Sequence, residues 1–188
     1  MVQNIEYMLI KQKLLFSREE CKSILQTVNT WDDTIISVKL DSTFTKKGGV
    51  MKSFNAIFDS NTIWIKDRIL NWINQLDGVF EIDTNKDLRA YYRKYVKGDY
   101  FVKHNDHVDG GINQIYTIGI MLYCSDDLLG GGLKFYSNDD IIDVDFKIGN
   151  VYIFDSSIPH SVDLIELGER ITLMIFIGGL ELKNTKLI

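Results

Sequence analysis

Two histidines and an aspartate have a spacing that predicts a metal site. His104 and Asp106 are separated by one residue, and His160 follows far downstream. In an extended segment, residues i and i+2 point to the same face, so His104 and Asp106 are expected to project together from one strand. Two imidazoles and one carboxylate can occupy one face of an octahedral metal ion and leave the opposite face open. That is the ligand set of non-haem Fe(II) sites.

Ten residues after the second histidine, Arg170 adds a group that could hold an organic co-substrate. A guanidinium pairs bidentately with a carboxylate, and Thr172 on the same strand face could add a hydroxyl. The alternative is a surface arginine paired with Glu169 or Glu166. The apolar residues that follow Arg170 favour a strand entering the core, where an unpaired guanidinium would be costly. A metal and a carboxylate clamp together indicate a 2-oxoglutarate site.

Length and composition limit the classes of protein that fit. The chain has 188 residues, of which 45% are hydrophobic, which predicts one domain (1–188) with an ordinary core. The net charge of -5 argues against nucleic acid or a membrane surface as a partner. The basic pair Lys46 and Lys47 is interpreted as a solvated loop tip. The composition leaves the oligomeric state open.

No targeting or membrane-spanning segment is predicted. The longest apolar run, within 171–180, is about half of the roughly 20 residues that a spanning helix needs, and the N-terminus lacks the features of a signal peptide. The two cysteines have no metal-finger or redox spacing, so we expect reduced thiols and a cytoplasmic protein.

The chain divides into a helical first part and a strand-rich second part. Helices are predicted at 17–30, where Ser17 and Glu20 form a capping-box pattern, and from 60 or 61 to 76. From residue 88, short β-branched and aromatic runs alternate with turn residues, a pattern typical of a sandwich or barrel. Strands are predicted at 88–96, 100–106, 115–123, 133–136, 141–146, 150–154, 160–164 and 170–177. The expected fold is mainly β with flanking helices, a jelly roll supported by N-terminal helices.

Five short motifs resemble those of the 2-oxoglutarate and Fe(II)-dependent dioxygenases, and within them the prolyl 4-hydroxylase-like branch. The resemblance covers about 88–180, a double-stranded β-helix core in that family, and leaves 1–87 as helical support and lid region. The motifs are Y-x-x-G-x-x-F-x-x-H-x-D (Tyr95, Gly98, Phe101, His104, Asp106), G-G-x-L (Gly130, Gly131, Leu133), G-x-x-x-x-F-D-S (Gly149, Phe154, Asp155, Ser156), H-x-V (His160, Val162) and R-x-T (Arg170, Thr172).

The resemblance implies a function and a role for each site residue. His104, Asp106 and His160 would bind Fe(II), Arg170 and Thr172 would hold the far carboxylate of 2-oxoglutarate, and Tyr95 would hydrogen-bond the keto acid. O₂ would be the oxidant and ascorbate the reductant. The first expectation is hydroxylation of a prolyl residue in a peptide or protein, with release of succinate and CO₂. Two alternatives stay open: hydroxylation of a free amino acid or other small metabolite, and a jelly-roll binding module without catalysis.

One position departs from the family pattern. Several prolyl hydroxylase-like members have a tyrosine on the strand after the H-x-D loop that touches the far carboxylate, and Met121 aligns with it here. Methionine cannot donate that hydrogen bond, so Tyr95, Thr117 or Tyr123 is expected to replace it. Segments 44–55 and 109–111 are predicted either as lid loops over the open face of the metal or, equally, as plain hairpin tips. Asn105 and His107 are not expected to be ligands, and Pro159 is expected to fix the backbone before His160.

Overall fold

The computed structural model describes residues 10–28, 32–39, 45–56, 58–76, 88–106, 114–137, 140–144 and 147–178. Within these residues there are two helices, α1 (Arg18–Leu25) and α2 (Ile63–Asn74). The strands are β1 (Ile10–Leu14), β2 (Asp32–Lys39), β3 (Thr45–Ala56), β4 (Arg89–Val96), β5 (Tyr100–His104), β6 (Gln114–Cys124), β7 (Leu129–Gly130), β8 (Leu133–Ser137), β9 (Asp140–Asp143), β10 (Asn150–Asp155), β11 (His160–Val162), β12 (Ile165–Leu167) and β13 (Glu169–Gly178).

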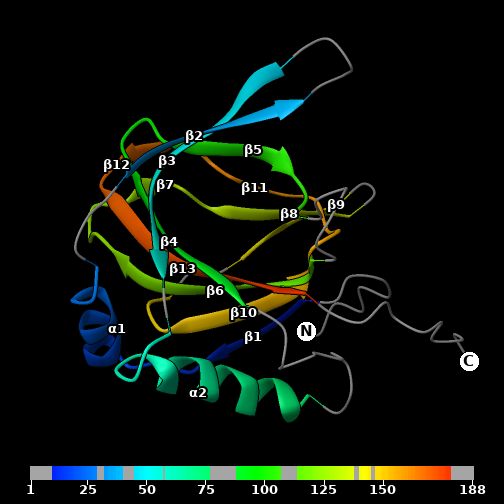
Figure 1. The fold of residues 1–188 in the computed structure, drawn as a ribbon. Helices are drawn as coiled ribbons and strands as arrows, with labels where there is room; N and C mark the ends of the chain where they lie inside the picture. Colours follow the sequence, from blue (N-terminus) through cyan, green and yellow to red (C-terminus); the bar gives the residue numbers. More distant parts are fainter. Residues whose placement is uncertain are drawn as a thin grey trace, which may run out of the picture.

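Most of these strands form one antiparallel sheet that curls over on itself. Its order in the described part of the chain is β1-β10-β6-β13-β4-β3-β5-β11-β8-β9, with β2 paired to β3 and a separate ladder of β12 and β7. The curl places β5, β11 and β8 across an interior from β4, β13 and β6 (Figure 1). This arrangement confirms the predicted mainly β jelly-roll fold.

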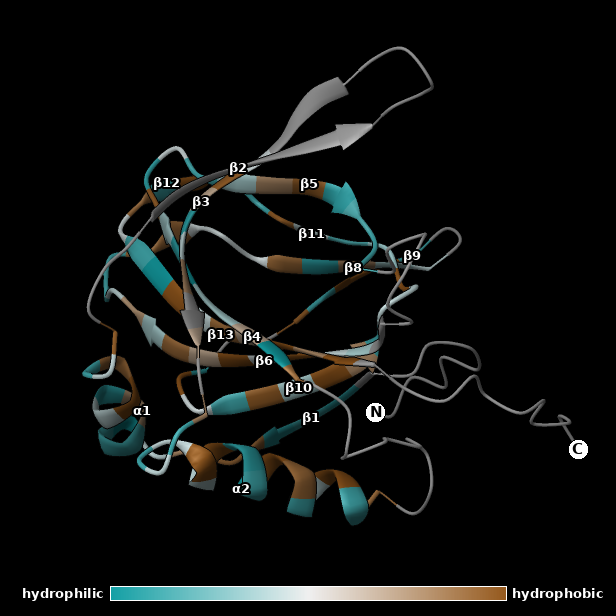
Figure 2. Ribbon diagram, in the orientation of Figure 1, coloured by the Kyte–Doolittle hydropathy of each residue, from teal (hydrophilic) through white to brown (hydrophobic). Residues whose placement is uncertain are grey.

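The two helices cover the outer face of the sheet, as predicted (Figure 1). Ile65, Ile69 and Trp72 of α2 and Cys21 and Ile24 of α1 are buried. They pack in one core cluster with residues from the outer face of β6, β10 and β13. Exposed polar residues such as Asp67 and Asn71 lie between the buried residues of α2, and hydrophobic and hydrophilic segments alternate along its ribbon (Figure 2). Packing of an amphipathic face therefore anchors both helices.

Both helices are shorter than the sequence predicted. The Ser17 capping box is confirmed: the Ser17 hydroxyl accepts the Glu20 N–H, and the Glu20 carboxylate accepts the Ser17 N–H. The helix ends at Leu25 because the next residues turn more tightly, with Thr27 donating its N–H and its hydroxyl to the Ile24 carbonyl. Neither helix is long and apolar enough to cross a membrane within the described residues.

The region before residue 88 is not only helical, which corrects the sequence prediction. It also supplies β1, which extends one edge of the sheet beside β10, and the β2–β3 hairpin. The predicted lid 44–55 is mostly strand β3, paired with β4 and β5. At Gly49, an added Cβ would lie 2.9 Å from the Phe101 ring. Residues 109–111 and His107 lie outside the described residues, as do the side chains of Lys46 and Lys47.

Candidate metal centre

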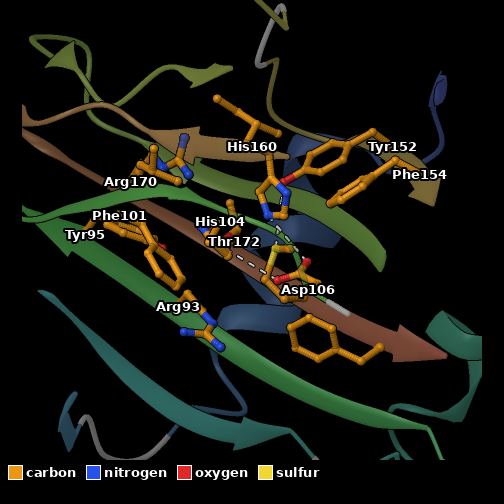
Figure 3. A pocket seen from close by; sticks show the side chains of 14 residues that line it. Arg93, Tyr95, Phe101, His104, Asp106, Tyr152, Phe154, His160, Arg170 and Thr172 are labelled. Atoms are coloured by element: carbon orange, nitrogen blue, oxygen red, sulfur yellow. Dashed lines mark hydrogen bonds and ion pairs between the residues drawn. The ribbon is translucent and has the colours of Figure 1, made fainter. Parts of the chain in front are cut away.

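The two predicted histidines face each other across a strand pair. His104 ends β5, His160 begins β11, and the two are direct partners in this antiparallel ladder. Asp106 lies in the bend after β5, not on the strand as predicted, and its N–H donates to the Ser156 carbonyl at 2.8 Å. That bond ties the loop to the end of β10. The three side chains converge at one end of the barrel interior (Figure 3).

Their donor atoms are spaced for a single cation. His104 Nε2 lies 3.5 Å from Asp106 Oδ1, and His160 Nε2 lies 3.4 Å from Asp106 Oδ2. One ligand atom from each of the three residues falls within 4.8 Å of the others. The set predicted from the sequence is thus brought together, with both imidazoles turned toward the carboxylate.

Hydrogen bonds on the far side of each imidazole fix its tautomer. His104 Nδ1 lies 2.8 Å from the Val102 carbonyl, and His160 Nδ1 lies 2.9 Å from the Ile158 carbonyl. A carbonyl can only accept, so each Nδ1 carries the proton and a neutral ring leaves Nε2 with a bare lone pair. Two bare nitrogens then face a carboxylate that also only accepts. A cation between them resolves this conflict, so the residues fit a metal ion.

Burial favours the protonation states that a metal requires. Desolvation lowers the pKa of His160, which is 4% exposed and packs against Phe154 at a ring distance of 4.9 Å. For Asp106, burial alone would raise the pKa, but the polar groups around the carboxylate, which include the two imidazoles and the Thr117 hydroxyl, outweigh burial and hold the pKa below its ordinary value. Thr117 also donates its hydroxyl to Asp106 Oδ2 at 2.7 Å. Two neutral imidazoles and one carboxylate are the result.

Thr117 and Ser156 form a support behind the carboxylate that the motifs only partly revealed. Their hydroxyls lie 3.1 Å apart, and both side chains are fully buried. Because the Ser156 carbonyl also accepts the Asp106 N–H, both the backbone and the side chain of Asp106 are positioned. Partners of this kind orient ligands and tune their basicity. Thr117, expected as a possible replacement for the family tyrosine, has this role instead.

Arg170 lies further along the same interior, buried at 2% exposure. It donates to the Gly131 carbonyl, and its guanidinium lies 5.0 Å from the centre of the Tyr95 ring, its strand partner. Gly131 has φ +71°, and a Cβ there would meet the Ile165 side chain at 2.2 Å, so the G-G-x-L turn requires glycine. Burial lowers the pKa of Arg170. Thr172 is also buried and lines the same pocket, as predicted.

The departure at Met121 has a structural explanation that the sequence did not reveal. Met121 is fully buried but does not line the pocket. Two residues earlier on β6, Gly119 leaves space that is filled by Tyr152 from β10: a Cβ at Gly119 would lie 2.1 Å from the Tyr152 hydroxyl. Tyr152 lines the pocket, whereas Tyr123 is 36% exposed and does not. The phenols near Arg170 are therefore Tyr95 and Tyr152.

The three metal residues line one pocket together with Arg170, Thr172 and the two phenols, and this pocket has about 420 Å³ of empty space including its open mouth. The metal residues and Arg170 lie in the same cavity and not in separate compartments (Figure 3). Asn105 is exposed and stays outside it. The lining residues are Arg93, Tyr95, Phe101, His104, Asp106, Leu133, Tyr152, Phe154, His160, Val162, Arg170, Thr172, Met174 and Phe176.

The family model and the solved structures that resemble this chain point to the same family. Residues 90–178 match the family model of the 2OG-Fe(II) oxygenase superfamily. A comparison with curated proteins gives no significant sequence match. Among solved structures, similar folds include a prolyl-4-hydroxylase from Pseudomonas putida (TM-score 0.65, 15% identity, covering 95% of this chain and 97% of that one).

Two further structures share this fold. One is the viral collagen prolyl hydroxylase of Paramecium Bursaria Chlorella virus-1 in a 2OG complex (TM-score 0.65, 16% identity, 96% of this chain and 100% of that one). The other is a prolyl hydroxylase from Trichoplax adhaerens in complex with a hypoxia inducible factor peptide fragment (TM-score 0.63, 14% identity, 94% and 85%). The shared fold includes the helices and strands before residue 88.

Proposed function

We propose that the chain is a member of the 2OG-Fe(II) oxygenase superfamily, whose family model matches residues 90–178, and that it hydroxylates an aliphatic C–H bond, with a prolyl residue of a peptide or protein as the first substrate class. One observation carries this proposal. Two imidazoles of fixed tautomer and one carboxylate share a pocket with a buried arginine. The prolyl hydroxylases of the same fold support the choice of substrate.

His104, Asp106 and His160 would hold Fe(II) through the two Nε2 atoms and the carboxylate. The Val102 and Ile158 carbonyls keep both Nε2 atoms free of protons, and Thr117 and Ser156 keep the carboxylate in place. Three protein ligands would leave other positions of the ion open to co-substrates. When bound, Fe(II), 2-oxoglutarate and O₂ supply the oxidising chemistry, which yields succinate, CO₂ and the hydroxylated product.

Arg170 and Thr172 would bind the far carboxylate of 2-oxoglutarate. A cation buried as deeply as Arg170 gains most from a partner of opposite charge. The phenols of Tyr95 and Tyr152 are close enough to influence the electrostatics of that guanidinium, and both can donate a hydrogen bond. Burial raises the pKa of both phenols, so they stay protonated donors. The apolar side chains between the metal and Arg170 would exclude water.

The proposal also covers the extent of the catalytic domain, the cellular location and the reductant. We expect one catalytic domain over 1–188, a cytoplasmic location in keeping with the free thiols of Cys21 and Cys124, and ascorbate as the reductant that maintains Fe(II).

Turnover of 2-oxoglutarate without a primary substrate tests the proposed oxygenase activity. Purified protein with Fe(II), ascorbate and 2-oxoglutarate should release succinate above the level of a His160→Ala variant. Charge-transfer absorbance of the anaerobic Fe(II) complex checks binding of the keto acid directly.

Hydroxylation of a free amino acid or small metabolite is the second candidate. The observation that favours it is a charged residue, Arg93, in the wall of a small pocket. Mass spectrometry distinguishes the two: proline-containing peptides and free amino acids are incubated in parallel, and a gain of one oxygen identifies the substrate class. Gain of oxygen by neither class, together with no succinate release, would contradict the proposed hydroxylase.

A further inference from the structure

Arg93 is a second arginine in the pocket, and it is not among the residues proposed above to hold the metal or 2-oxoglutarate. It lies on β4 with its side chain among the pocket-lining residues, partly exposed. Its guanidinium donates to Met51 Sδ at 2.8 Å and lies 5.7 Å from the centre of the Tyr91 ring. A thioether is only a weak acceptor. No carboxylate of the described residues forms an ion pair with Arg93, so its charge is available to an anionic ligand.

Arg93 and Arg170 serve different parts of the pocket. On the ladder between β4 and β13, Arg170 is the partner of Tyr95, and Arg93 is the partner of Thr172. The two guanidinium groups are well separated in the pocket and extend to different sides of it (Figure 3). If 2-oxoglutarate reaches from the metal to Arg170, its two carboxylates are both accounted for there. Arg93 then lies on the side left for the primary substrate.

The surroundings of Arg93 define the rest of that ligand. Tyr91 and Phe176 pack edge to face with ring centres 5.9 Å apart, and Phe101 and Met174 add further apolar surface. Aromatic and thioether groups around one guanidinium suit an aliphatic body with an attached anion. The chain has a net charge of -5, so an anion is not attracted by the protein as a whole and needs a local cation.

We propose that Arg93 binds a carboxylate of the primary substrate, and thereby selects substrates in which a carboxylate lies close to the C–H bond to be oxidised. The inference rests on the proposed function, because it places 2-oxoglutarate at Arg170. The carboxylate belongs either to a free amino acid or to an acidic side chain beside the target residue of a peptide. Bidentate geometry favours a carboxylate, which two parallel N–H groups of one guanidinium match.

The test measures binding under nitrogen, so that no turnover occurs. Protein loaded with Fe(II) and 2-oxoglutarate is titrated by calorimetry with proline and other aliphatic amino acids, each paired with its neutral amide. A second arm compares N-acetylated, C-terminally amidated Pro-Asp with Pro-Asn. We expect at least one acid of a pair to bind about tenfold or more tightly than its neutral partner, as for a hydrogen bond to a charged group. The arm that shows the preference identifies the source of the carboxylate.

Two variants separate the role of Arg93 from a general charge effect. Arg93→Gln should remove the preference for the acid and leave the affinity for 2-oxoglutarate within about twofold. Lys94→Gln removes the same charge from the adjacent residue, which pairs with Glu169 at 2.7 Å and does not line the pocket, and it should keep the preference. Arg93→Lys should restore part of it, since the charge stays and the two-pronged geometry is lost.

The outcomes are distinguishable. The proposal for Arg93 is overturned if protein that binds Fe(II) and 2-oxoglutarate binds acids and neutral partners equally, binds no acid, or keeps its preference in Arg93→Gln. Failure to bind Fe(II) or 2-oxoglutarate at all contradicts the proposed function instead.

Discussion

The two faces of the curled sheet carry cores of different composition. The outer core, beneath α1 and α2, consists of aliphatic and aromatic side chains with Cys21. The inner core also contains aromatic and aliphatic residues, but they surround charged and hydrogen-bonding groups: the metal residues, Arg170, Thr117 and Thr172. Burial of polar groups costs free energy that apolar packing elsewhere must offset. The outer face thus stabilises a sheet whose inner face is arranged for binding.

The largest expected effect is on the inner face. His160→Ala removes one of two imidazoles and should lower Fe(II)-dependent succinate release by roughly a hundredfold or more, since even indirect supports of a metal cost 10–100-fold. A binding readout is the shift in unfolding midpoint on adding Mn(II), which should occur in the wild type and be absent in the variant. A variant that still shows the full metal-dependent shift would contradict the assignment of His160 as a ligand.

A substitution in the outer core should lower stability without changing metal affinity. Ile69 of α2 is 2% exposed and packs in the outer core. Ile69→Ala should lower the free energy of unfolding by about 2–5 kcal/mol through lost burial and a cavity. Affinity for Mn(II) should be unchanged at temperatures where the protein is folded. The matched control is Asn71→Ala on the exposed side of the same helix, expected within about 0.5 kcal/mol of wild type by denaturant unfolding. Loss of metal affinity in Ile69→Ala would mean that the two faces are coupled.

Tyr152 tests whether the inner core contributes specific groups or only shape. Tyr152→Phe keeps the ring and removes the hydroxyl, which costs about 1 kcal/mol per hydrogen bond and should weaken 2-oxoglutarate binding roughly fivefold. Anaerobic charge-transfer titration measures the affinity. The control is Tyr123→Phe on β6, an exposed phenol outside the pocket, which should bind as wild type. Equal affinities for 2-oxoglutarate in both variants would show that Tyr152 only fills the space beside Gly119 and does not bind the keto acid.

The pH dependence of metal binding follows from the inner core as well. A histidine ligand must be neutral, and burial lowers the pKa of His160 below its ordinary value of 6.5. Metal affinity should be nearly constant from pH 8 to 7 and decline as pH falls through the lowered pKa of His160, while Asp106, whose pKa is lowered from its ordinary value of 3.8, stays ionised at neutral pH. In the metal-free protein, the unfolded chain takes up the proton first, so stability also falls as pH drops below about 6.5. Calorimetric titration of Mn(II) across this range measures the profile, and a decline already above pH 7 would contradict it.

The sequence predicted which side chains converge in the pocket better than it predicted the elements around them, for physical reasons. His104, Asp106 and Arg170 could be predicted from their spacing because residues two apart on a strand point to the same face. Asp106, however, lies in the bend after β5. Strand β3 was predicted as a lid because Gly48, Gly49 and its lysines hide the alternation of a strand. Strands β7 and β12 have two and three residues, too few for any periodic pattern.

Tyr152 was missed for a different reason. Every residue from Asn150 to Phe154 is buried, so β10 has no polar face that would show which side chains enter the pocket. The sequence also gives no sign of the role of Gly119, because its contact with Tyr152 depends on the pairing of β10 with β6. Residues whose role depends on a contact between two buried strands require coordinates.

The smallest expected effect is at the capping box of α1, on the outer side. Ser17→Ala removes the acceptor for the Glu20 N–H and should cost about 1 kcal/mol of unfolding free energy. Glu20 also pairs with Arg68 of α2 at 2.8 Å, but both side chains are more than a third exposed, so the pair adds little. Denaturant unfolding measures the cost, with Ser23→Ala on the exposed side of α1 as control. Metal and 2-oxoglutarate affinities should be unchanged in both variants, because the buried residues of α1 pack in the outer core. A change in either affinity would show that a shift of α1 displaces β6, and with it Thr117 and Asp106.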